Sequence, residues 1–169
     1  MGNGHPIAAV VTTREIADLF DTGMKYFNTF GGNPVSCAVA GAVLDVIAHE
    51  GLQARALEIG TEFRERLAGL DGRHPCIGDV RGEGLYIGVE LVADRITKEP
   101  AAALANAVCE RMLERGVIIY PNGDLGNVLK IKPPMVVSSD DVARFVDALD
   151  RTLTELTTGS FTRPPHQAT

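Results

Sequence analysis

The chain has 169 residues, about the length of one domain if a domain holds roughly 150 residues. Hydrophobic residues make up 45% and charged residues 22% of it, a balance typical of globular proteins and not of disordered chains. The net charge is −6 and aromatic residues are only 5%, so we expect no nucleic-acid partner. We expect no membrane partner either, because no apolar run reaches the ~18 residues that a membrane span needs.

The positions of the cysteines and histidines in the sequence predict neither a metal site nor a disulfide. Cys37, Cys76 and Cys109 are far apart and odd in number, which matches neither a disulfide framework nor a CxxC zinc motif. Reduced thiols are typical of the cytoplasm, where we expect the protein to reside. The four histidines show no ligand spacing with the acids or cysteines, so no metal site is predicted.

The first fifty residues predict a strand and two helices. Residues 7–12 are a short apolar run that suits a buried strand. Thr13 is placed to cap a short helix that reaches about residue 20. After an irregular stretch, a second helix is expected over residues 34–50, with Asn33 as its N-cap. This helix is apolar nearly all round, so a partner or a further segment must cover most of it.

From residue 52 onward the pattern predicts a small α/β domain. Ser138 and Asp141 have the spacing of a capping box at the start of the last helix. Helices packed on one face of a mainly antiparallel sheet suit this order of elements. The expected elements are a helix over 52–70, a strand over 85–92, a helix over 101–115, strands over 117–120 and 128–131, and a helix over 138–156.

Three places carry residues that could bind an anion. Thr29 stands in a Gly-rich loop just before a helix N-terminus, where backbone N–H groups favour phosphate, although a plain helix cap is the alternative. Lys130 and Lys132 lie two apart in a strand and so share one face. They form either a cationic patch for a carboxylate or phosphate, or an edge strand's protection against aggregation. Arg81 could hold an anion, or form a structural bridge to Glu83, Glu90 or a helix end.

Four segments, taken in order, resemble class III (ornithine/GABA-type) pyridoxal-phosphate-dependent aminotransferases. The resemblance extends over nearly the whole chain, to about Leu156. The segments are 2–10 (Gly-Asn-Gly-His-Pro-Ile-Ala-Ala-Val), 28–34 (Asn-Thr-Phe-Gly-Gly-Asn-Pro), 80–91 (Val-Arg-Gly-Glu-Gly-Leu-Tyr-Ile-Gly-Val-Glu-Leu) and 129–134 (Leu-Lys-Ile-Lys-Pro-Pro).

The resemblance implies the C-terminal part of a fold-type I enzyme, an α/β fold. Residues 1–33 would be the end of the large cofactor-binding domain, and 34–50 the long connecting helix. Residues 51–157 would form the small C-terminal domain, and 158–169 a disordered tail. Pyridoxal 5'-phosphate would be the cofactor, and two subunits would share each active site. Thr29 matches the family's threonine that binds the phosphate of the neighbouring subunit's cofactor.

The same resemblance implies that the catalytic lysine is not in this chain. The family's Schiff-base lysine precedes the Gly-Asn-Gly turn in a pattern like Lys-Pro-Met-Gly-Asn-Gly. Met1 falls at the methionine of that pattern, so the lysine would lie two residues before it. None of the four lysines of this sequence matches that position. We therefore expect the chain to be inactive alone, because a neutral amine is needed for the chemistry.

Lys130 indicates the branch of the family. Most class III enzymes carry an arginine in this motif, which clamps the substrate carboxylate, and lysine replaces a bidentate fork poorly. Residues 127–135 look like the phospho-lyase branch, similar to ethanolamine-phosphate phospho-lyases, and related alanine–glyoxylate aminotransferase 2-like proteins share much of the pattern. The expected reaction is transamination or phosphate elimination on a small amine or amino acid, with Lys130 on its anionic group. The alternatives are a non-catalytic remnant that pairs with a full-length subunit, and a small thiol enzyme using Cys37 or Cys76.

Overall fold

The computed structural model describes residues 1–158. The chain divides into two compact units, Met1–Leu52 and Gln53–Thr169, and each is described by itself. The tail expected over 158–169 lies outside the described residues except for Thr158 itself, which ends a helix. No single helix in the described part of the chain is long and apolar enough to cross a membrane, although the helices Pro34–His49 and Leu52–Ala68 pass that test when taken together.

The first unit contains two helices and no strand. Helix α1 is Arg14–Phe20 and helix α2 is Pro34–His49. The strand expected over residues 7–12 is wrong: this segment has no regular structure and is mostly exposed. A strand needs a neighbour for its backbone N–H and C=O groups, and residues 1–52 supply none. Thr13 precedes α1 as expected, but its side chain makes no capping hydrogen bond.

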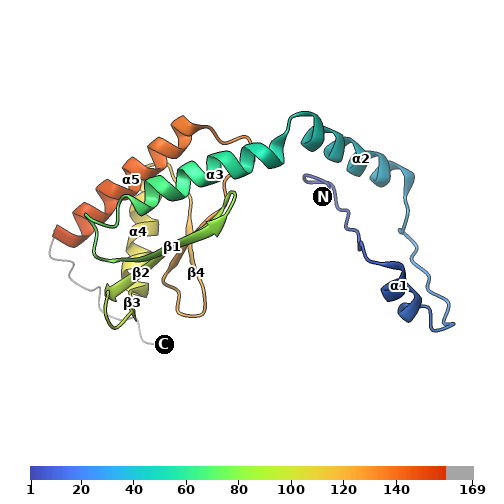
Figure 1. The fold of residues 1–169 in the computed structure, drawn as a ribbon, viewed down its shortest axis with the longest axis horizontal. Helices are drawn as coiled ribbons and strands as arrows, with labels where there is room; N and C mark the ends of the chain where they lie inside the picture. The colour runs from blue at the N-terminus through green and yellow to red at the C-terminus, as the bar shows by residue number, and fades with distance from the viewer. Residues whose placement is uncertain (159–169) are drawn as a thin grey trace. The chain divides into compact units, whose positions relative to one another are not determined.

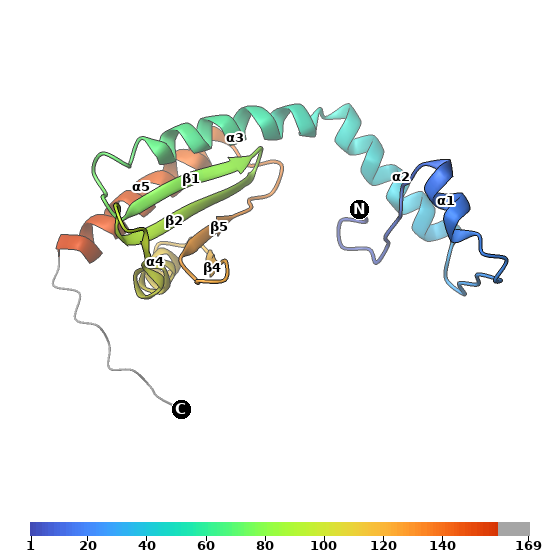
Figure 2. The ribbon, with the colours of Figure 1, turned by 60° about the horizontal axis from the view of Figure 1, so that its bottom comes forward.

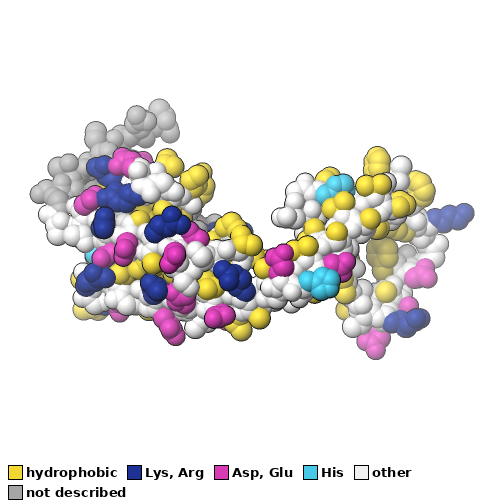
Figure 3. Space-filling view, turned by 90° about the horizontal axis from the view of Figure 1, so that it is seen from above, with side chains coloured by type: hydrophobic (Ala, Val, Ile, Leu, Met, Phe, Trp, Pro, Cys, Tyr) yellow, Lys and Arg dark blue, Asp and Glu magenta, His cyan; other side chains and the backbone are white. Residues whose placement is uncertain are grey.

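Helix α2 begins and ends as the sequence predicts. The side-chain oxygen of Asn33 accepts hydrogen bonds from the N–H groups of Val35 and Ser36, at 3.0 and 3.1 Å. Gly51 follows the helix with a φ of 62°, the left-handed conformation that suits glycine. Ala40 is the single buried residue of the helix. Figure 3 shows hydrophobic side chains gathered on the first unit. Val35 and Leu44 of α2 are exposed.

The second unit is a mixed α/β layer, with three helices on one side of an antiparallel sheet (Figures 1 and 2). The strand order is β1-β2-β5-β4, and the short β3 pairs with β2. Every pairing is antiparallel, which confirms the expected sheet. The elements are α3 (Leu52–Ala68), β1 (Ile77–Glu83), β2 (Tyr86–Asp94), β3 (Glu99–Pro100), α4 (Ala102–Glu114), β4 (Tyr120–Asn122), β5 (Val128–Ile131) and α5 (Ser139–Thr158).

Three strands differ from those expected, and one of them is the short β3, which was not predicted. Strand β1 was not predicted, because its sequence Ile-Gly-Asp-Val-Arg-Gly-Glu has two glycines and no clean apolar alternation. Strand β4 is Tyr120–Asn122 instead of 117–120. It includes Pro121, which breaks the sequence pattern of a strand. Proline is tolerated there because β4 ends the strand order and so lies at an edge of the sheet.

The core lies between the sheet and its three helices. Along β2 the residues Ile87, Val89 and Leu91 are buried, and Leu129 and Ile131 of β5 face the same side. The pairing places Ile87 beside Ile131 and Val89 beside Leu129. These side chains pack against buried residues of the helices, namely Ile59, Phe63, Leu67, Ala105, Val108, Met112, Val142, Leu149 and Leu153. The alternate residues of the strands therefore face away from the helices.

Helix α5 begins with the capping box that the sequence predicts. The N–H of Ser138 donates to the Asp141 carboxylate at 3.0 Å, and the N–H of Asp141 donates to the Ser138 hydroxyl at 3.2 Å. Hydrogen bonds from the Ser138 hydroxyl and N–H, with Arg144 nearby, hold the pKa of Asp141 at about 2, below its ordinary 3.8. The carboxylate is thus stabilised in the folded state.

The lowered pKa of Asp141 predicts a specific acid dependence of stability. A folded pKa of about 2 against an ordinary 3.8 gives a stabilisation that is complete above pH 4 and lost as the pH falls toward 2. We expect Asp141→Asn to lower the free energy of unfolding at pH 7. The difference from wild type should shrink between about pH 4 and pH 2. Urea unfolding of both proteins across this range measures it, and a constant difference would contradict the assignment.

Candidate functional site

The helix-free face of the sheet brings together residues from four strands. The pairings place Arg81 of β1 beside Gly88 of β2, Gly88 beside Lys130 of β5, and Lys130 beside Tyr120 of β4. Directly paired residues of an antiparallel sheet point to the same face. This row of Arg81, Gly88, Lys130 and Tyr120 therefore crosses the sheet on the side away from the hydrophobic core.

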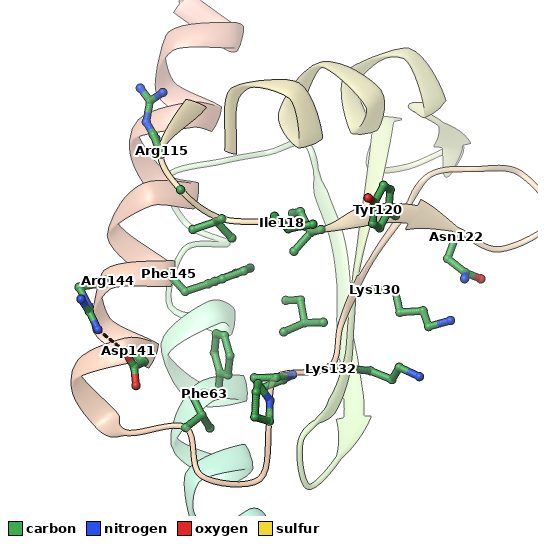
Figure 4. Close-up of a pocket in the computed structure, with 17 residues that line it drawn as sticks. Phe63, Arg115, Ile118, Tyr120, Asn122, Lys130, Lys132, Asp141, Arg144 and Phe145 are labelled. Atoms are coloured by element: carbon green, nitrogen blue, oxygen red, sulfur yellow. Dashed lines mark hydrogen bonds and ion pairs between the residues drawn. The ribbon is translucent and has the colours of Figure 1, made fainter. Parts of the chain in front are cut away.

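Lys130 and Lys132 share this face, as the sequence predicts. Figure 4 shows their side chains side by side, pointing the same way and away from Phe63 and Phe145. The ammonium of Lys132 lies 5.7 Å from the centroid of the Tyr86 ring, within the range of a cation–π contact. Neither lysine forms an ion pair with any carboxylate among residues 1–158. Both charges are therefore available to a ligand.

The charge of Arg81 is not available to a ligand in the way that the charges of the two lysines are. Its guanidinium donates to Asp79 at 2.8 Å and to Glu90 at 2.5 Å. Hydrogen bonds to Asp79 and then Glu90 raise its pKa. Of the two readings that the sequence allowed, the structural bridge to Glu90 is confirmed. Two carboxylates already balance this cation, which leaves Lys130 as the better anion-binding group of the row.

Two hollows adjoin Lys130. The larger has a volume of about 680 Å³ and opens where the chain before β4 and the chain after β5 separate (Figure 4). Its lining includes the apolar Phe63 and Phe145 as well as Lys130 and Lys132. The smaller has a volume of about 350 Å³ and lies over Gly88. Lys130 lines both, so it is the cation best placed to meet a bound molecule.

Thr29 lies in the first unit, in an exposed turn before α2. The Asn28 side chain accepts from the N–H groups of Phe30 and Gly31, both at 3.1 Å, and Asn33 occupies the first free N–H groups of α2. The helix end is therefore already capped, which favours the plain-cap reading over a phosphate site on backbone amides. The Thr29 hydroxyl has no hydrogen-bond partner among the described residues and is free to bind one.

Of the two cysteines considered for a thiol enzyme, Cys76 is a poor candidate. Burial raises the pKa of Cys76, and it raises the pKa of Cys109 to about 11. A thiol with a raised pKa is a poor nucleophile because little thiolate is present at neutral pH. In residues 1–158 the structure also brings together no group of three or more His, Cys, Asp or Glu side chains that could hold a metal ion.

Sequence reasoning missed the neighbours of Lys130. Tyr86 and Gly88 alternate with the apolar residues of β2, and that alternation was visible. It did not say which strand lies beside β2, because that depends on the pairing of β2 with β5, some forty residues further along the chain. Tyr120 was expected as the last residue of the strand over 117–120, whereas Asn122 was missed because that strand was expected to end before it.

Comparison with known proteins gives the chain its family. The model of the family "Aminotransferase class-III" matches residues 1–153. The chain is 49% identical to an alanine–glyoxylate aminotransferase 2-like protein of Drosophila melanogaster, over 86% of this chain and 30% of that protein. It is 47% identical to alanine–glyoxylate aminotransferase 2 homolog 2, mitochondrial, of Arabidopsis thaliana, over 92% of this chain and 32% of that protein.

A solved structure agrees with these relatives. A phospholyase from Arthrobacter, in complex with phosphoethanolamine, is 42% identical, with a TM-score of 0.86 over 92% of this chain and 37% of that chain. The chain thus spans about a third of the length of the proteins it matches. The sheet, its helices and the order of the four segments agree with this likeness. The chain belongs to the class III aminotransferase family, whose cofactor is pyridoxal phosphate, and matches the C-terminal part of its fold-type I structure.

Proposed function

We propose that this chain is the C-terminal portion of a phospho-lyase of the class III family, which eliminates phosphate from a small phosphorylated amine. The observation that carries the proposal is Lys130 on the helix-free face of the sheet, in place of the arginine that most of the family carries. Among residues 1–158 this cation has no ion-pair partner. The likeness to a phospholyase solved with phosphoethanolamine supports it. In this proposal Lys130 binds the anionic end of the substrate.

The described residues fit part of a pyridoxal-phosphate site. Thr29 lies in an exposed turn, and its hydroxyl has no hydrogen-bond partner in the described part of the chain, which suits a single hydrogen bond to the cofactor phosphate of a neighbouring subunit. When bound, the cofactor supplies an electron sink for the carbanion beside the amine. None of the lysines of this chain matches the family's Schiff-base position. We therefore propose that this chain binds the phosphate edge of the cofactor and does not catalyse the reaction alone.

Two further properties belong to the proposal. The apolar side chains exposed on the first unit, among them Phe27, Phe30 and Val35, support a homodimer in which a second subunit covers them. They equally favour the second candidate function, a non-catalytic module that pairs with a full-length subunit. Three cysteines outside any disulfide support a cytoplasmic location. The relative from Arabidopsis thaliana is named mitochondrial, so the mitochondrion is the alternative compartment.

The experiment compares this chain with the longest polypeptide expressed from its gene. With the 169-residue chain and pyridoxal phosphate, we expect no turnover and no single borohydride-reducible lysine. With the longer polypeptide, we expect phosphate release from phosphoethanolamine and no keto acid from alanine plus glyoxylate. Keto-acid formation without phosphate release would overturn the phospho-lyase proposal in favour of transamination. No activity on either substrate pair would favour the non-catalytic module.

The role of Lys130 is tested in the same assay. Lys130→Met should raise KM for phosphoethanolamine at least tenfold, because it removes a charge-assisted contact worth roughly 1.5–3 kcal/mol. The matched control is Lys98→Met, which removes the same charge from a lysine whose ammonium bonds to the Gly78 carbonyl. Equal KM values for the two variants would contradict a substrate role for Lys130.

A further inference from the structure

Gly88 occupies an unexpected place for a glycine. It lies within β2 on the helix-free face, with Arg81 beside it on one neighbouring strand and Lys130 on the other. Glycine in the interior of a strand weakens it, because it adds backbone entropy and no packing side chain. Such a residue therefore needs a reason in the conformation of the backbone, in close packing, or in function.

Backbone conformation and close packing do not supply the reason. The φ of Gly88 is outside the left-handed region, unlike that of Gly82, which is 144°. A Cβ at residue 88 would meet only the Val128 Cγ1 methyl, at 3.2 Å, a tight contact that a shift of a few tenths of an ångström in the Val128 side chain relieves. A Cβ at residue 82 would instead lie 2.1 Å from the Tyr86 carbonyl oxygen. The fold demands glycine at 82 but would accept a small side chain at 88.

A side chain at residue 88 would change the smaller hollow. This space of about 350 Å³ has Gly88 in its lining, with Arg81, Tyr86, Asn122, Val128 and Lys130 around it. Its volume falls within the range of small-molecule sites. The carboxylates of Asp79 and Glu90 balance the charge of Arg81. Among the described residues that line the hollow, Lys130 therefore supplies the uncompensated positive charge. The Asn122 side chain adds a polar group. The missing side chain of Gly88 leaves room for an anion beside the lysine.

We propose that Gly88 is a specificity-determining residue, which keeps the hollow beside Lys130 open for the phosphate group of a small phosphorylated amine. The inference rests on the proposed function, since it takes Lys130 as the phosphate-binding cation. It adds a second element, a steric one. The charge of Lys130 attracts the anion, and the absence of a side chain at residue 88 sets how large a group can approach that charge.

The test is a binding titration of the full chain followed by NMR. Phosphoethanolamine is the probe, and ethanolamine, which lacks the phosphate, is the matched ligand. We expect amide shifts in strands β1, β2 and β5 with phosphoethanolamine only. Gly88→Val should weaken binding at least tenfold and Gly88→Ala less. The control Gly72→Val should leave it unchanged, because a Cβ at residue 72 meets nothing within 4 Å. Dispersed spectra establish that each variant is folded.

The outcomes separate this inference from the proposed function. If Lys130→Met abolishes binding and Gly88→Val leaves it unchanged, the role of Gly88 is overturned and that of Lys130 stands. If neither variant changes binding, both proposals fail. Both proposals are also overturned if the wild-type chain shows no amide shifts at a phosphoethanolamine concentration 50-fold above a millimolar Kd. A millimolar Kd corresponds to roughly 4 kcal/mol of binding free energy. The inference is supported if phosphoethanolamine affinity falls in Gly88→Ala, falls further in Gly88→Val, and is also lost in Lys130→Met.

Discussion

Replacing Gly60 by alanine is expected to lower the free energy of unfolding of the second unit by about 3 kcal/mol, at the upper end of the cost of overpacking. Gly60 lies in α3, where the helix crosses the turn between β1 and β2. A Cβ at residue 60 would lie 2.0 Å from the carbonyl oxygen of Gly84 and 2.2 Å from its carbonyl carbon. Both are backbone atoms of a tight turn. They cannot move aside as a flexible side chain would.

The sign of the effect makes this a sharp test. In an exposed helix, glycine to alanine stabilises by about 1 kcal/mol, because alanine has the higher helix propensity. A lower free energy of unfolding in Gly60→Ala therefore reports the contact with Gly84 and not the helix propensity of residue 60. Urea unfolding measures the change, with Gly72→Ala as control, since a Cβ there meets nothing within 4 Å. Stabilisation by Gly60→Ala would show that helix and turn lie further apart than described.

The contact between Gly60 and Gly84 shows what the sequence can and cannot predict. Periodicity predicted α3 from its own residues, but it did not say which turn lies against that helix. The contact of α3 with the turn at Gly84 depends on packing between segments more than twenty residues apart. In the same way, Ser138 and Asp141 form the predicted capping box because its partners are local. The pair of His74 and Asp150, at 2.6 Å, joins distant segments and left no signal in the sequence.

The candidate site shows the same difference between local features, which the sequence predicts, and contacts between distant segments, which it does not. Lys130 and Lys132 share a face because β5 alternates, and the sequence showed this. Gly88 could be assigned to the site only from the register of β2 against β5, which places it beside Lys130. Thr29 was named first from its Gly-rich loop and then from the resemblance, and it lies in an exposed turn before α2. Local chemistry thus gave the charged residue of the proposed site, whereas pairing between strands gave the space beside it.

Removing the ring of Phe63 is expected to have the other large effect on stability. Phe63 is 2% exposed in α3, and its ring packs edge to face on Phe145 of α5, with centroids 5.1 Å apart. It joins the two helices to the sheet within one core cluster. Phe63→Ala should cost about 4 kcal/mol, the sum of lost burial and the cavity left behind. Many domains are stable by only 5–15 kcal/mol, so between about a quarter and four-fifths of the stability would be lost.

Phe63→Leu is the matched variant, because it keeps an apolar side chain in the same place and should cost about 1.5 kcal/mol. Urea unfolding of Phe63→Ala, Phe145→Ala and the double variant isolates the contact of the two rings. We expect a coupling free energy of about 1 kcal/mol, as found for edge-to-face aromatic pairs. Additive losses would mean that each ring packs on other neighbours. A cost below 1 kcal/mol for Phe63→Ala would contradict the position of Phe63 at the centre of this core.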